Sequence, residues 1–582
     1  MRIDSNRRGF IKGSATFGIA AMIAGCTGQD PDDDDDNGRE NGDPPDDGTP
    51  EPDVEYEPLP TYNYHTLPRS DDAEGYEWAV MARQQLEVLG FDFDWEVLES
   101  STWADRLFAR DWDFNHLTWF GTIERVYPYY NLFYSFHSQF ATEAGGNFQM
   151  WESEEYDEAV ENFIEAQELE EQQQWANRCQ EILALNQPVI FGLHEDTLSA
   201  ANTDQFTNWN GMLDWNVYWN VNSLRDIEAV GDAEEVVFGT PIEQENYPNF
   251  FAVTGNSLET HKMSYDTPLA YDYDGELYGL AAEDWEFVDE TTIDVTLRDG
   301  MTWHDGEDVT AEDLKFTWDA IQEYPVPYIE SDVEPYESSE LLDDLTVRFN
   351  LSRPFGGFTR ISLFRVPILP RHVWDGVTER EGLEHPGEWT DPDMTGSGPF
   401  EFVSYEPGDR IVYQKNPDHR FADDIDFETL VYRVYGAEAT LTGDLIDGQV
   451  TFAQRMGPTH WDRANDAPNV EATAEPSIAA NGVWCRCDMA PFNDVRVRQA
   501  LAHAINIQEV IDIIYRGRGE RAVSPVAPAN EAFYNEDVAR YDYDLDRARE
   551  LLMEAGLRWD DDGRLMMPVD WEPEVEYISP DD

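Results

Sequence analysis

Apolar and polar residues change their spacing between Tyr278 and Ile321, and this change predicts a strand, two turns and a helix. The strand is half-buried because every second residue is apolar; these residues are Ile293, Val295 and Leu297. Two Asp-Gly pairs follow and predict tight reversals, since glycine tolerates positive φ. The helix begins after Thr310, whose side chain can form a capping box with Asp313.

Similar patterns occur closer to the N-terminus. Residues 77–89 have the apolar spacing of a helix that ends at Gly90, and residues 91–97 alternate as in a strand. Residues 156–166 and 171–185 predict two further helices. Regular elements are therefore expected on both sides of the central stretch.

The first 26 residues indicate an export signal rather than a domain. Residues 6–12 (NRRGFIK) resemble a twin-arginine signal, and the apolar run at 15–25 is too short to span a bilayer permanently. Residues 23–26 (IAGC) resemble a lipobox, which implies lipidation at Cys26. Residues 27–55 carry scarcely any hydrophobic side chains and predict a disordered acidic tether.

Composition narrows the function classes. The chain has 582 residues, of which 41% are hydrophobic, so it is not a disordered or fibrous protein. Its formal net charge of −83 repels nucleic acid and anionic membrane surfaces. The chain contains few lysines, namely Lys12, Lys262, Lys315 and Lys415. Because the acidic residues are spread along the whole chain, we expect a halophilic protein of haloarchaeal type, adapted to molar salt.

Four cysteines are too few for a disulfide scaffold. Cys485 and Cys487 lie two residues apart on a predicted strand, so their side chains point the same way and are poorly disposed to bridge. No histidine lies near them, and small buried hydrophobic residues are the better interpretation. Cys179 falls in a helical run and is interpreted as packing. We expect no bound metal and no cofactor.

Several motifs resemble those of the extracytoplasmic solute-binding proteins of the peptide/nickel/oligosaccharide ABC import family (family 5). They are LAAEDWEF at 280–287, LRDGMTWHDGEDVTAEDL at 297–314, GSGPF at 396–400, FNDVRVRQAL at 492–501 and DLDRARELLMEAG at 544–556. The resemblance implies an α/β fold, a two-lobed type II periplasmic-binding-protein-like clamshell with mixed sheets that closes on a solute. His304 and Asp305 belong to the HDG motif and are interpreted as turn residues, not as a catalytic or metal site.

These motifs occur in a changed order along the chain. Residues 56–226, which include RCQEILALNQPVIFGLHE at 178–195, resemble the last third of the family. Residues from 236 onward resemble its beginning. The resemblance therefore implies a circular permutation, which is physically reasonable because permutation succeeds where chain ends lie close together and the new break is exposed.

The permutation determines the expected domains. Residues 190–480 are expected to form one continuous lobe, and residues 56–189 together with 481–582 the other, split lobe. Tyr62–Leu67 and Val575–Ile578 are then expected to meet as neighbouring pieces of one sheet region.

The resemblance also indicates where a solute binds. In peptide-binding relatives an acidic residue, in a segment matched here by residues 119–128, pairs with the α-amino group of the ligand. Glu124 takes that position, with Trp119 and Thr122 in the same segment. Its longer side chain and the following Arg125 depart from the family pattern, and an ordinary acidic surface residue is the alternative.

Further ligand-binding candidates come from two other segments. Trp484 and Arg486 lie in the segment that carries the chain between the lobes, and Tyr247 and Tyr265 are comparable candidates from the other lobe. Since tryptophan is more often a core residue than a ligand platform, core packing is the alternative. No catalytic residue is predicted.

The predicted function is that of a lipid-anchored solute-binding protein on the extracellular face of the cell membrane. It is expected to be a monomer that delivers peptides or a similar small solute to an ABC permease and binds no nucleic acid. An exported hydrolase is one alternative, although the sequence contains no G-x-S-x-G and no H-E-x-x-H motif. A non-transport surface or sensor protein is another, although no fixed-period repeat is present.

Overall fold

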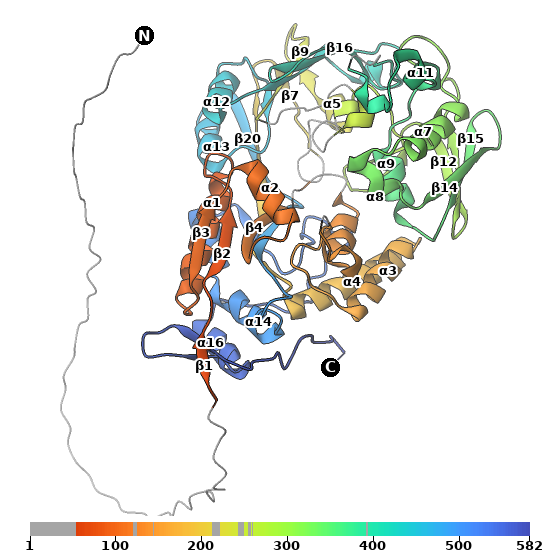
Figure 1. The fold of residues 1–582 in the computed structure, drawn as a ribbon. Helices are drawn as coiled ribbons and strands as arrows, with labels where there is room; N and C mark the ends of the chain where they lie inside the picture. The colour runs from red at the N-terminus through yellow and green to blue at the C-terminus, as the bar shows by residue number, and fades with distance from the viewer. Residues whose placement is uncertain are drawn as a thin grey trace, which may run out of the picture. The chain divides into compact units, whose positions relative to one another are not determined.

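Strands that lie far apart in the sequence share the two largest sheets of the computed structural model (Figure 1). The structure describes residues 54–119, 121, 125–143, 145–211, 221–241, 249–253, 258, 260–390 and 394–581. Two compact units divide the chain at Asp53, and all described residues belong to the second unit.

The first large sheet has five strands in the order β3-β2-β4-β21-β5. Their bounds are Tyr62–Thr66 (β2), Phe93–Val97 (β3), Phe114–Trp119 (β4), Val189–Phe191 (β5) and Ala480–Cys485 (β21). β2 is parallel to both β3 and β4, whereas β21 is antiparallel to β4 and β5. Helices α1 (Ala73–Glu87) and α14 (Val495–Ala504) contact this sheet, and α16 (Leu545–Glu554) packs on α14.

The second large sheet has the order β16-β17-β18-β9-β19-β6-β20, with β22 paired to β6. The bounds are Leu193–Asn202 (β6), Glu235–Thr240 (β9), Phe400–Glu406 (β16), Arg410–Lys415 (β17), Thr429–Val434 (β18), Phe452–Ala453 (β19), Val470–Pro476 (β20) and Gly519–Arg521 (β22). β9 is parallel to β18 and β19, and the remaining pairs are antiparallel. Both large sheets are therefore mixed, as expected.

Two segments of the chain run from one large sheet into the other. The segment 189–202 contains β5 and then β6, and the segment 470–485 contains β20 and then β21. The two segments are bonded to each other at the crossing, where the Gly192 N–H donates to the Asn481 carbonyl at 2.8 Å and the Leu193 N–H donates to Asn481 Oδ1 at 3.2 Å. This pair of crossing segments is where a hinge between the sheets is expected to lie.

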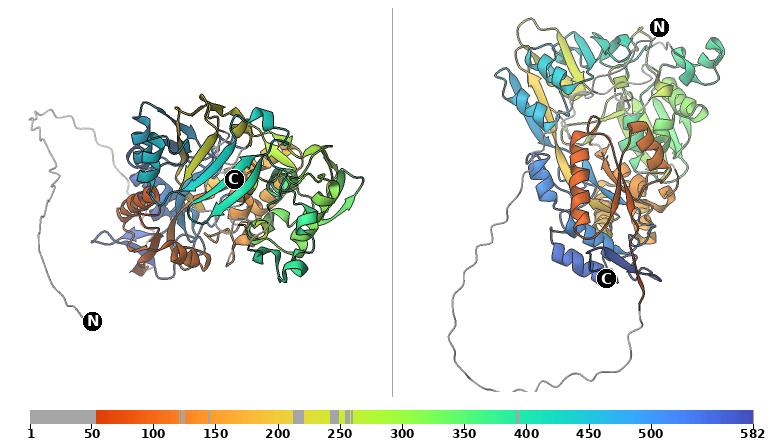
Figure 2. Two further views of the ribbon diagram at one scale, coloured as in Figure 1. Left: turned by 90° about the horizontal axis from the view of Figure 1, so that it is seen from above. Right: turned by 60° about the vertical axis from the view of Figure 1, so that its left-hand side comes forward.

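A third sheet contains the strand that was predicted within residues 278–321, and the predicted helix lies against this sheet. Its order is β12-β13-β15-β14, with bounds Ala282–Asp289 (β12), Thr292–Leu297 (β13), Tyr336–Leu341 (β14) and Thr346–Leu351 (β15). Helix α7 (Ala311–Glu323) packs on it and lies beside it in every view (Figure 2). The predicted capping box is present, since the Thr310 N–H donates to Asp313 Oδ2 at 2.9 Å.

The HDG motif forms a turn, as predicted. Gly306 has a φ of 89°, a conformation that favours glycine. The His304 side chain bridges to the GSGPF motif, because its Nδ1 accepts from the Gly396 N–H at 3.1 Å and its Nε2 donates to the Gly398 carbonyl at 3.1 Å. Burial lowers the pKa of His304, which keeps the ring neutral in this bridge. The residue therefore holds two loops together.

The remaining predicted helices are also found. Helices α3 (Glu154–Glu165) and α4 (Leu169–Asn186) pack against each other where two helices were expected. Further elements are α2 (Ser100–Phe108), α5 (Val221–Asp226), α8 (Glu330–Val333), α9 (Leu363–Arg365), α10 (Arg371–Trp374), α11 (Val377–Glu381), α12 (Glu438–Ile446), α13 (Pro458–Asn465), α15 (Ile507–Ile513), β7 (Phe206–Thr207), β8 (Glu228–Ala229), β10 (Leu269–Tyr271), β11 (Leu277–Gly279), β23 (Arg558–Trp559) and the π-helices η2 (Tyr130–Tyr134) and η7 (Phe358–Ser362), besides short 3-10 helices.

The two ends of the described chain meet in a small sheet, but not through the residues predicted. β1 (Tyr56–Pro58) pairs antiparallel with β24 (Leu565–Pro568). The expectation that Tyr62–Leu67 and Val575–Ile578 meet as neighbouring pieces of one sheet region is wrong, because β2 has β3 and β4 on its two sides and residues 575–578 form no strand. The later segment contacts helix ends instead, where the Ile578 N–H donates to Asn186 Oδ1 at 2.8 Å.

The cysteines in the described part of the chain are buried and free, as predicted for Cys179, Cys485 and Cys487. Cys26 lies outside the described residues. No helix among the described residues is both long and apolar enough to cross a membrane. Within the same residues no group of three or more His, Cys, Asp or Glu side chains has the arrangement of a metal site.

Stability is expected to fall in mild acid because two histidines are buried in the large sheets, His116 on β4 of the five-stranded sheet and His194 on β6 of the second. Burial lowers the pKa of His116 to about 4 and that of His194 to about 4, whereas both side chains titrate near pH 6.5 in the unfolded chain. Between these values the unfolded state binds more protons than the folded state, so acidification favours unfolding. Each histidine contributes a loss of up to about 1.4 kcal/mol per pH unit as the pH falls from 6.5 towards 4.

Urea unfolding at a series of pH values measures this effect. The His194→Gln variant should show a shallower dependence of the unfolding free energy on pH than the wild type, because it lacks one of the histidines whose pKa burial lowers. Equal slopes for the variant and the wild type would contradict the assignment.

Candidate functional site

The carboxyl ends of parallel strands from the two large sheets meet at one contact. Gly121 follows the end of β4, and Arg455 follows the end of β19. The Arg455 Nη2 donates to the Gly121 carbonyl across the two sheets. Since ligands of open α/β sheets bind outside the carboxyl ends of the strands, this contact marks the candidate site.

Val126 and Asn131 are bonded to a loop from the C-terminal part of the chain. The Val126 carbonyl accepts from Asn530 Nδ2 at 2.8 Å, and Asn131 Nδ2 donates to the Pro525 carbonyl at 2.9 Å. The Arg125 guanidinium donates to Asn131 Oδ1 at 3.2 Å. The backbone at this strand end is therefore held in place by amide side chains.

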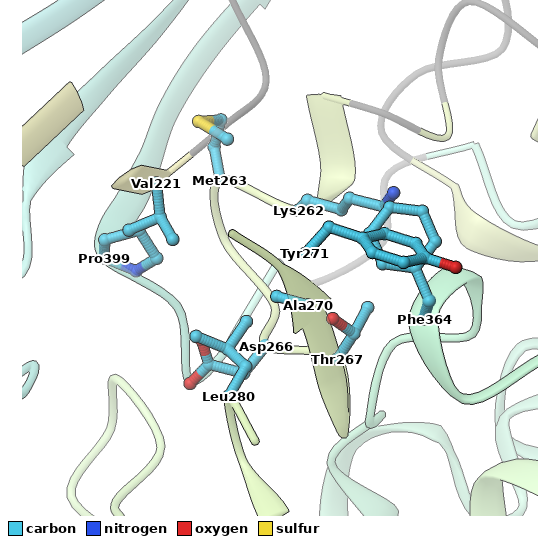
Figure 3. Close-up of a pocket in the computed structure, with 10 residues that line it drawn as sticks. All are labelled: Val221, Lys262, Met263, Asp266, Thr267, Ala270, Tyr271, Leu280, Phe364 and Pro399. Carbon is cyan, nitrogen blue, oxygen red and sulfur yellow. The ribbon is translucent and has the colours of Figure 1, made fainter. Parts of the chain in front are cut away.

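A small pocket lies beside this segment (Figure 3). Its volume is about 40 Å³, and its lining residues are Val221, Lys262, Met263, Asp266, Thr267, Ala270, Tyr271, Leu280, Phe364 and Pro399. A single water occupies roughly 10–15 Å³ on this measure, so the pocket has room for about three waters or for one end group of a solute. It is too small for a whole peptide.

The pocket connects to the strand-end contact through one apolar cluster. Tyr271 and Phe364, which line the pocket, pack with Val126, Ile478 and Ala527. Val126 belongs to the segment after β4, and Ile478 to the second crossing segment. The pocket therefore adjoins both the candidate site and the expected hinge.

The polar groups of the pocket differ in what they contact. The Lys262 ammonium lies 3.9 Å from the centroid of the Phe364 ring, a cation–π arrangement. Asp266 faces His419, with 3.4 Å between Asp266 Oδ1 and His419 Nε2. The Tyr271 hydroxyl donates to the Arg360 carbonyl at 2.8 Å, and burial raises the pKa of this phenol. Tyr271 is thus a neutral wall residue, and Lys262 supplies the positive charge.

The sequence of residues 276–581, a little more than half of the chain, matches the family described as bacterial extracellular solute-binding proteins, family 5 middle. The chain belongs to this family. Its fold is the type II periplasmic-binding-protein-like α/β fold with mixed sheets that the motifs implied. The family consists of binding proteins rather than enzymes.

Proteins whose sequences are similar to this chain include peptide-binding proteins. The dipeptide-binding protein of Escherichia coli (strain K12) is 27% identical over 296 residues, which are 47% of this chain and 54% of that protein. The oligopeptide-binding protein AppA of Bacillus subtilis (strain 168) is 28% identical over 336 residues, which are 56% of this chain and 60% of that protein. The chain thus spans little more than half the length of these relatives.

Two solved structures are also similar to part of the chain. The structure of AppA from Bacillus subtilis in complex with a nonapeptide matches with a TM-score of 0.44 and 24% sequence identity, covering 58% of this chain and 67% of that chain. The structure of NikZ from Campylobacter jejuni in complex with Ni(L-His) matches with a TM-score of 0.44 and 19% identity, covering 59% of this chain and 66% of that chain.

Two of the predicted ligand-binding residues are brought together in the core. Trp119 and Trp484 lie on neighbouring strands with ring centroids 4.6 Å apart, and they are 6% and 2% exposed. The Trp119 indole donates to Ser135 Oγ at 3.0 Å. Their rings therefore pack the five-stranded sheet in this structure, which is the alternative that the sequence left open, and a ligand role for them stays a prediction.

The other predicted residues lie apart from this pair. Tyr265 is buried, and its hydroxyl contacts Met394 Sδ at 3.7 Å. The Arg486 guanidinium pairs with Asp488 at 2.5 Å and donates to the Arg110 carbonyl at 2.6 Å, so it serves a local turn. Glu124, Thr122 and Tyr247 lie outside the described residues, as does Cys26.

Sequence patterns missed Lys262, Asp266 and Arg455. None of them belongs to a motif, and loops after strands are positioned by tertiary packing rather than by local periodicity. The sequence did contain one signal for Lys262, which is one of very few lysines in a strongly acidic chain. Asp266 follows it closely in sequence. A rare cation in such a chain is therefore a candidate binding group.

Proposed function

We propose that this protein is an extracytoplasmic solute-binding protein that delivers peptides or a similar small solute to an ABC import permease. Membership in the solute-binding family is the observation that carries the proposal. The peptide-binding relatives support peptides as the solute class. The protein acts as a monomer and does not bind nucleic acid, in keeping with its net charge of −83.

The solute binds between the two large sheets, beside the contact of Gly121 with Arg455. A parallel strand of each large sheet ends at this contact. The two crossing segments supply the hinge about which the lobes close on the solute. Glu124 anchors an ammonium group of the solute. Its place in the sequence supports this role, because it lies between Gly121 and Val126, and the latter packs against the pocket wall.

The two lobes arise from a circularly permuted chain. Residues 190–480 make the continuous lobe, and residues 56–189 with 481–582 make the split lobe. Two observations support this assignment. The five-stranded sheet combines strands from residues 62–119 with β21 at 480–485, and β1 pairs with β24 near the two chain ends.

The protein is exported and stays at the extracellular face of the cell membrane through a lipid on Cys26. The twin-arginine and lipobox resemblances at residues 6–12 and 23–26 support this location, and the tether at 27–55 gives the binding unit reach from the membrane. The acidic surface supports a haloarchaeal type of protein that works in molar salt.

A thermal-shift screen in molar KCl tests the proposed function. Dipeptides, oligopeptides, oligosaccharides and nickel complexes are added to the purified protein, and the melting temperature is recorded. A bound solute should raise it, because a ligand at about 100 times its Kd stabilises the folded state by about 2.7 kcal/mol. The absence of any shift, both from these compounds and from compounds that copurify, would contradict the proposal, as would turnover of any of them.

A further inference from the structure

One buried ion pair is built entirely within residues 190–480, the proposed continuous lobe. Asp332 lies on α8 and Arg365 on α9, and the Arg365 Nη1 donates to Asp332 Oδ2. Neighbours in the same lobe hold the pair, because Ser362 Oγ donates to the Asp332 carbonyl and Arg365 Cζ lies 5.1 Å from the centroid of the Tyr328 ring. The two opposite charges are therefore fixed before any other lobe contacts them.

The Tyr130 hydroxyl reaches this pair from residues 56–189, which belong to the proposed split lobe. It donates to Asp332 Oδ1 and accepts from Arg365 Nη1, so it bonds to both charges at once. The Arg125 guanidinium lies over the Tyr130 ring, with its Cζ 5.6 Å from the ring centroid. Since Arg125 belongs to the segment after β4, Tyr130 joins the proposed solute-binding segment to the ion pair of the other lobe.

The same two lobes also approach closely at a pair of adjacent glycines. The Gly356 N–H donates to the Ile164 carbonyl at 2.9 Å. A Cβ atom added to Gly356 would lie 1.7 Å from the Ala166 carbonyl oxygen, and one added to Gly357 would lie 2.9 Å from Cε1 of the Tyr127 ring. Glycine at these positions therefore permits a contact between the lobes that a larger side chain would prevent.

The Tyr130 hydroxyl acts on the balance between closed and open lobes. Charges taken out of water are costly unless their hydrogen bonds are satisfied, and in the closed arrangement this hydroxyl supplies a bond to each of the two. When the lobes separate, water takes the place of the hydroxyl, whereas Asp332 and Arg365 stay together because both belong to one lobe. The hydroxyl therefore stabilises the closed arrangement relative to the open one.

We infer that Tyr130 and the Asp332–Arg365 pair form a latch that holds the two lobes closed without a solute, so that a solute enters and leaves only when the latch opens. This inference rests on the proposed function and on the lobes assigned there. The latch needs no solute because its contacts are made by protein groups alone. Tyr130 is a positioning residue, since it acts on the solute only through lobe closure.

Hydrogen exchange of the full chain in molar KCl, with no solute added, tests the latch. The Gly356 amide reports opening, because its acceptor is the Ile164 carbonyl of the other lobe. Tyr130→Phe should lower the protection of this amide about tenfold or more, since two hydrogen bonds to charged groups are lost in the closed arrangement only. Amides shared between β13 and β15 should keep wild-type protection, which excludes general unfolding.

Tyr156→Phe is the matched control, because the Tyr156 hydroxyl donates to the Leu132 carbonyl at 2.9 Å and both residues belong to the split lobe. It should leave the protection of the Gly356 amide unchanged. Gly356→Ala opens the lobes by a different route, through the clash of its Cβ atom with the Ala166 carbonyl. Small-angle X-ray scattering should therefore give a larger radius of gyration for Gly356→Ala and for Tyr130→Phe than for the wild type.

Wild-type protection of the Gly356 amide in Tyr130→Phe would overturn the inference. Radii of gyration that equal the wild-type value in both Tyr130→Phe and Gly356→Ala would overturn it too. Both measurements are made without a solute, so either outcome leaves the proposed function intact. The proposed function fails separately, through the thermal-shift screen.

Discussion

Lowering the KCl concentration from about 1 M to about 0.1 M is expected to lower the melting temperature by about 10 °C or more. The cause is the net charge of −83, which destabilises the folded chain by self-repulsion wherever it is poorly screened. The Debye length grows from about 3 Å to about 10 Å over this range, so repulsion between neighbouring surface carboxylates is restored. With 38 basic residues against 121 acidic ones, most carboxylates have no surface cation to pair with.

Circular dichroism melts at a series of KCl concentrations measure this effect. Sucrose at equal osmolarity is the control, because it does not screen charge and should fail to replace the salt. A melting temperature that stays constant, or that rises as the salt is removed, would contradict the assignment of a salt-adapted surface.

Replacing Asp332 by alanine is expected to lower the free energy of unfolding by about 3–5 kcal/mol. Asp332 is fully buried on α8 and forms an ion pair with Arg365 of α9, whose side chain is 2% exposed. The Tyr130 hydroxyl, from η2, contacts both charges. Removal of the carboxylate leaves the Arg365 guanidinium buried without its anionic partner, and an unpaired buried charge is very costly.

Urea unfolding in molar KCl measures this loss, since guanidinium would change the ionic strength. Glu334→Ala is the matched control, because the pair of Glu334 with Arg353 has a similar separation of 2.9 Å but is 58% and 32% exposed; the expected loss is below about 1 kcal/mol. Joint replacement of Asp332 and Arg365 by leucine and methionine should recover much of the loss. If Asp332→Ala loses no more unfolding free energy than Glu334→Ala does, the Asp332–Arg365 pair does not behave as a buried ion pair, which would contradict the prediction.

The cluster also connects distant parts of the chain. Tyr130 follows the candidate site in sequence, whereas Asp332 precedes β14 and Arg365 follows β15 of the third sheet. Nearby, the Gly356 N–H donates to the Ile164 carbonyl at 2.9 Å, and an added Cβ at Gly356 would lie 1.7 Å from the Ala166 carbonyl oxygen. The contact between these segments is therefore tight as well as charged.

Local patterns predicted the elements that have strong local signals. The alternation at 293–297 and the Thr310–Asp313 capping box are short-range features, and β13 and α7 follow them closely. The HDG motif was correctly interpreted as a turn because its glycine and the helix that begins after it define the turn. The mixed character of the sheets came from the family resemblance rather than from any local feature.

Long-range pairing was harder to predict, and the reason is physical. β24 pairs with β1, more than 500 residues away in sequence, and the expected partner segment at 575–578 instead satisfies its backbone at helix ends. Nothing in the alternation of 62–67 shows which strands will flank it. Long-range partners are chosen by packing of the whole sheet.

A ligand-binding role for the segment 119–128 stays a prediction. Within this segment Gly121 lies at the strand-end contact, and Val126 packs with Tyr271 and Phe364, which line the pocket. The pocket itself was missed because its lining residues come from segments between 221 and 399 that only the folded chain brings together. Trp484 was a ligand-binding candidate, yet it is buried in the sheet in this structure. A tryptophan buried in a sheet and one exposed in a cleft look alike in sequence.

Isothermal titration calorimetry of the purified protein in molar KCl tests the central claim of solute binding most directly. The titrant is the compound that gives the largest melting shift in the screen, and the solution is analysed afterwards for chemical change. We expect saturable binding of one solute molecule per chain and recovery of the solute unchanged. Titration with no binding heat at any temperature tried, or recovery of a cleaved product, would contradict the account.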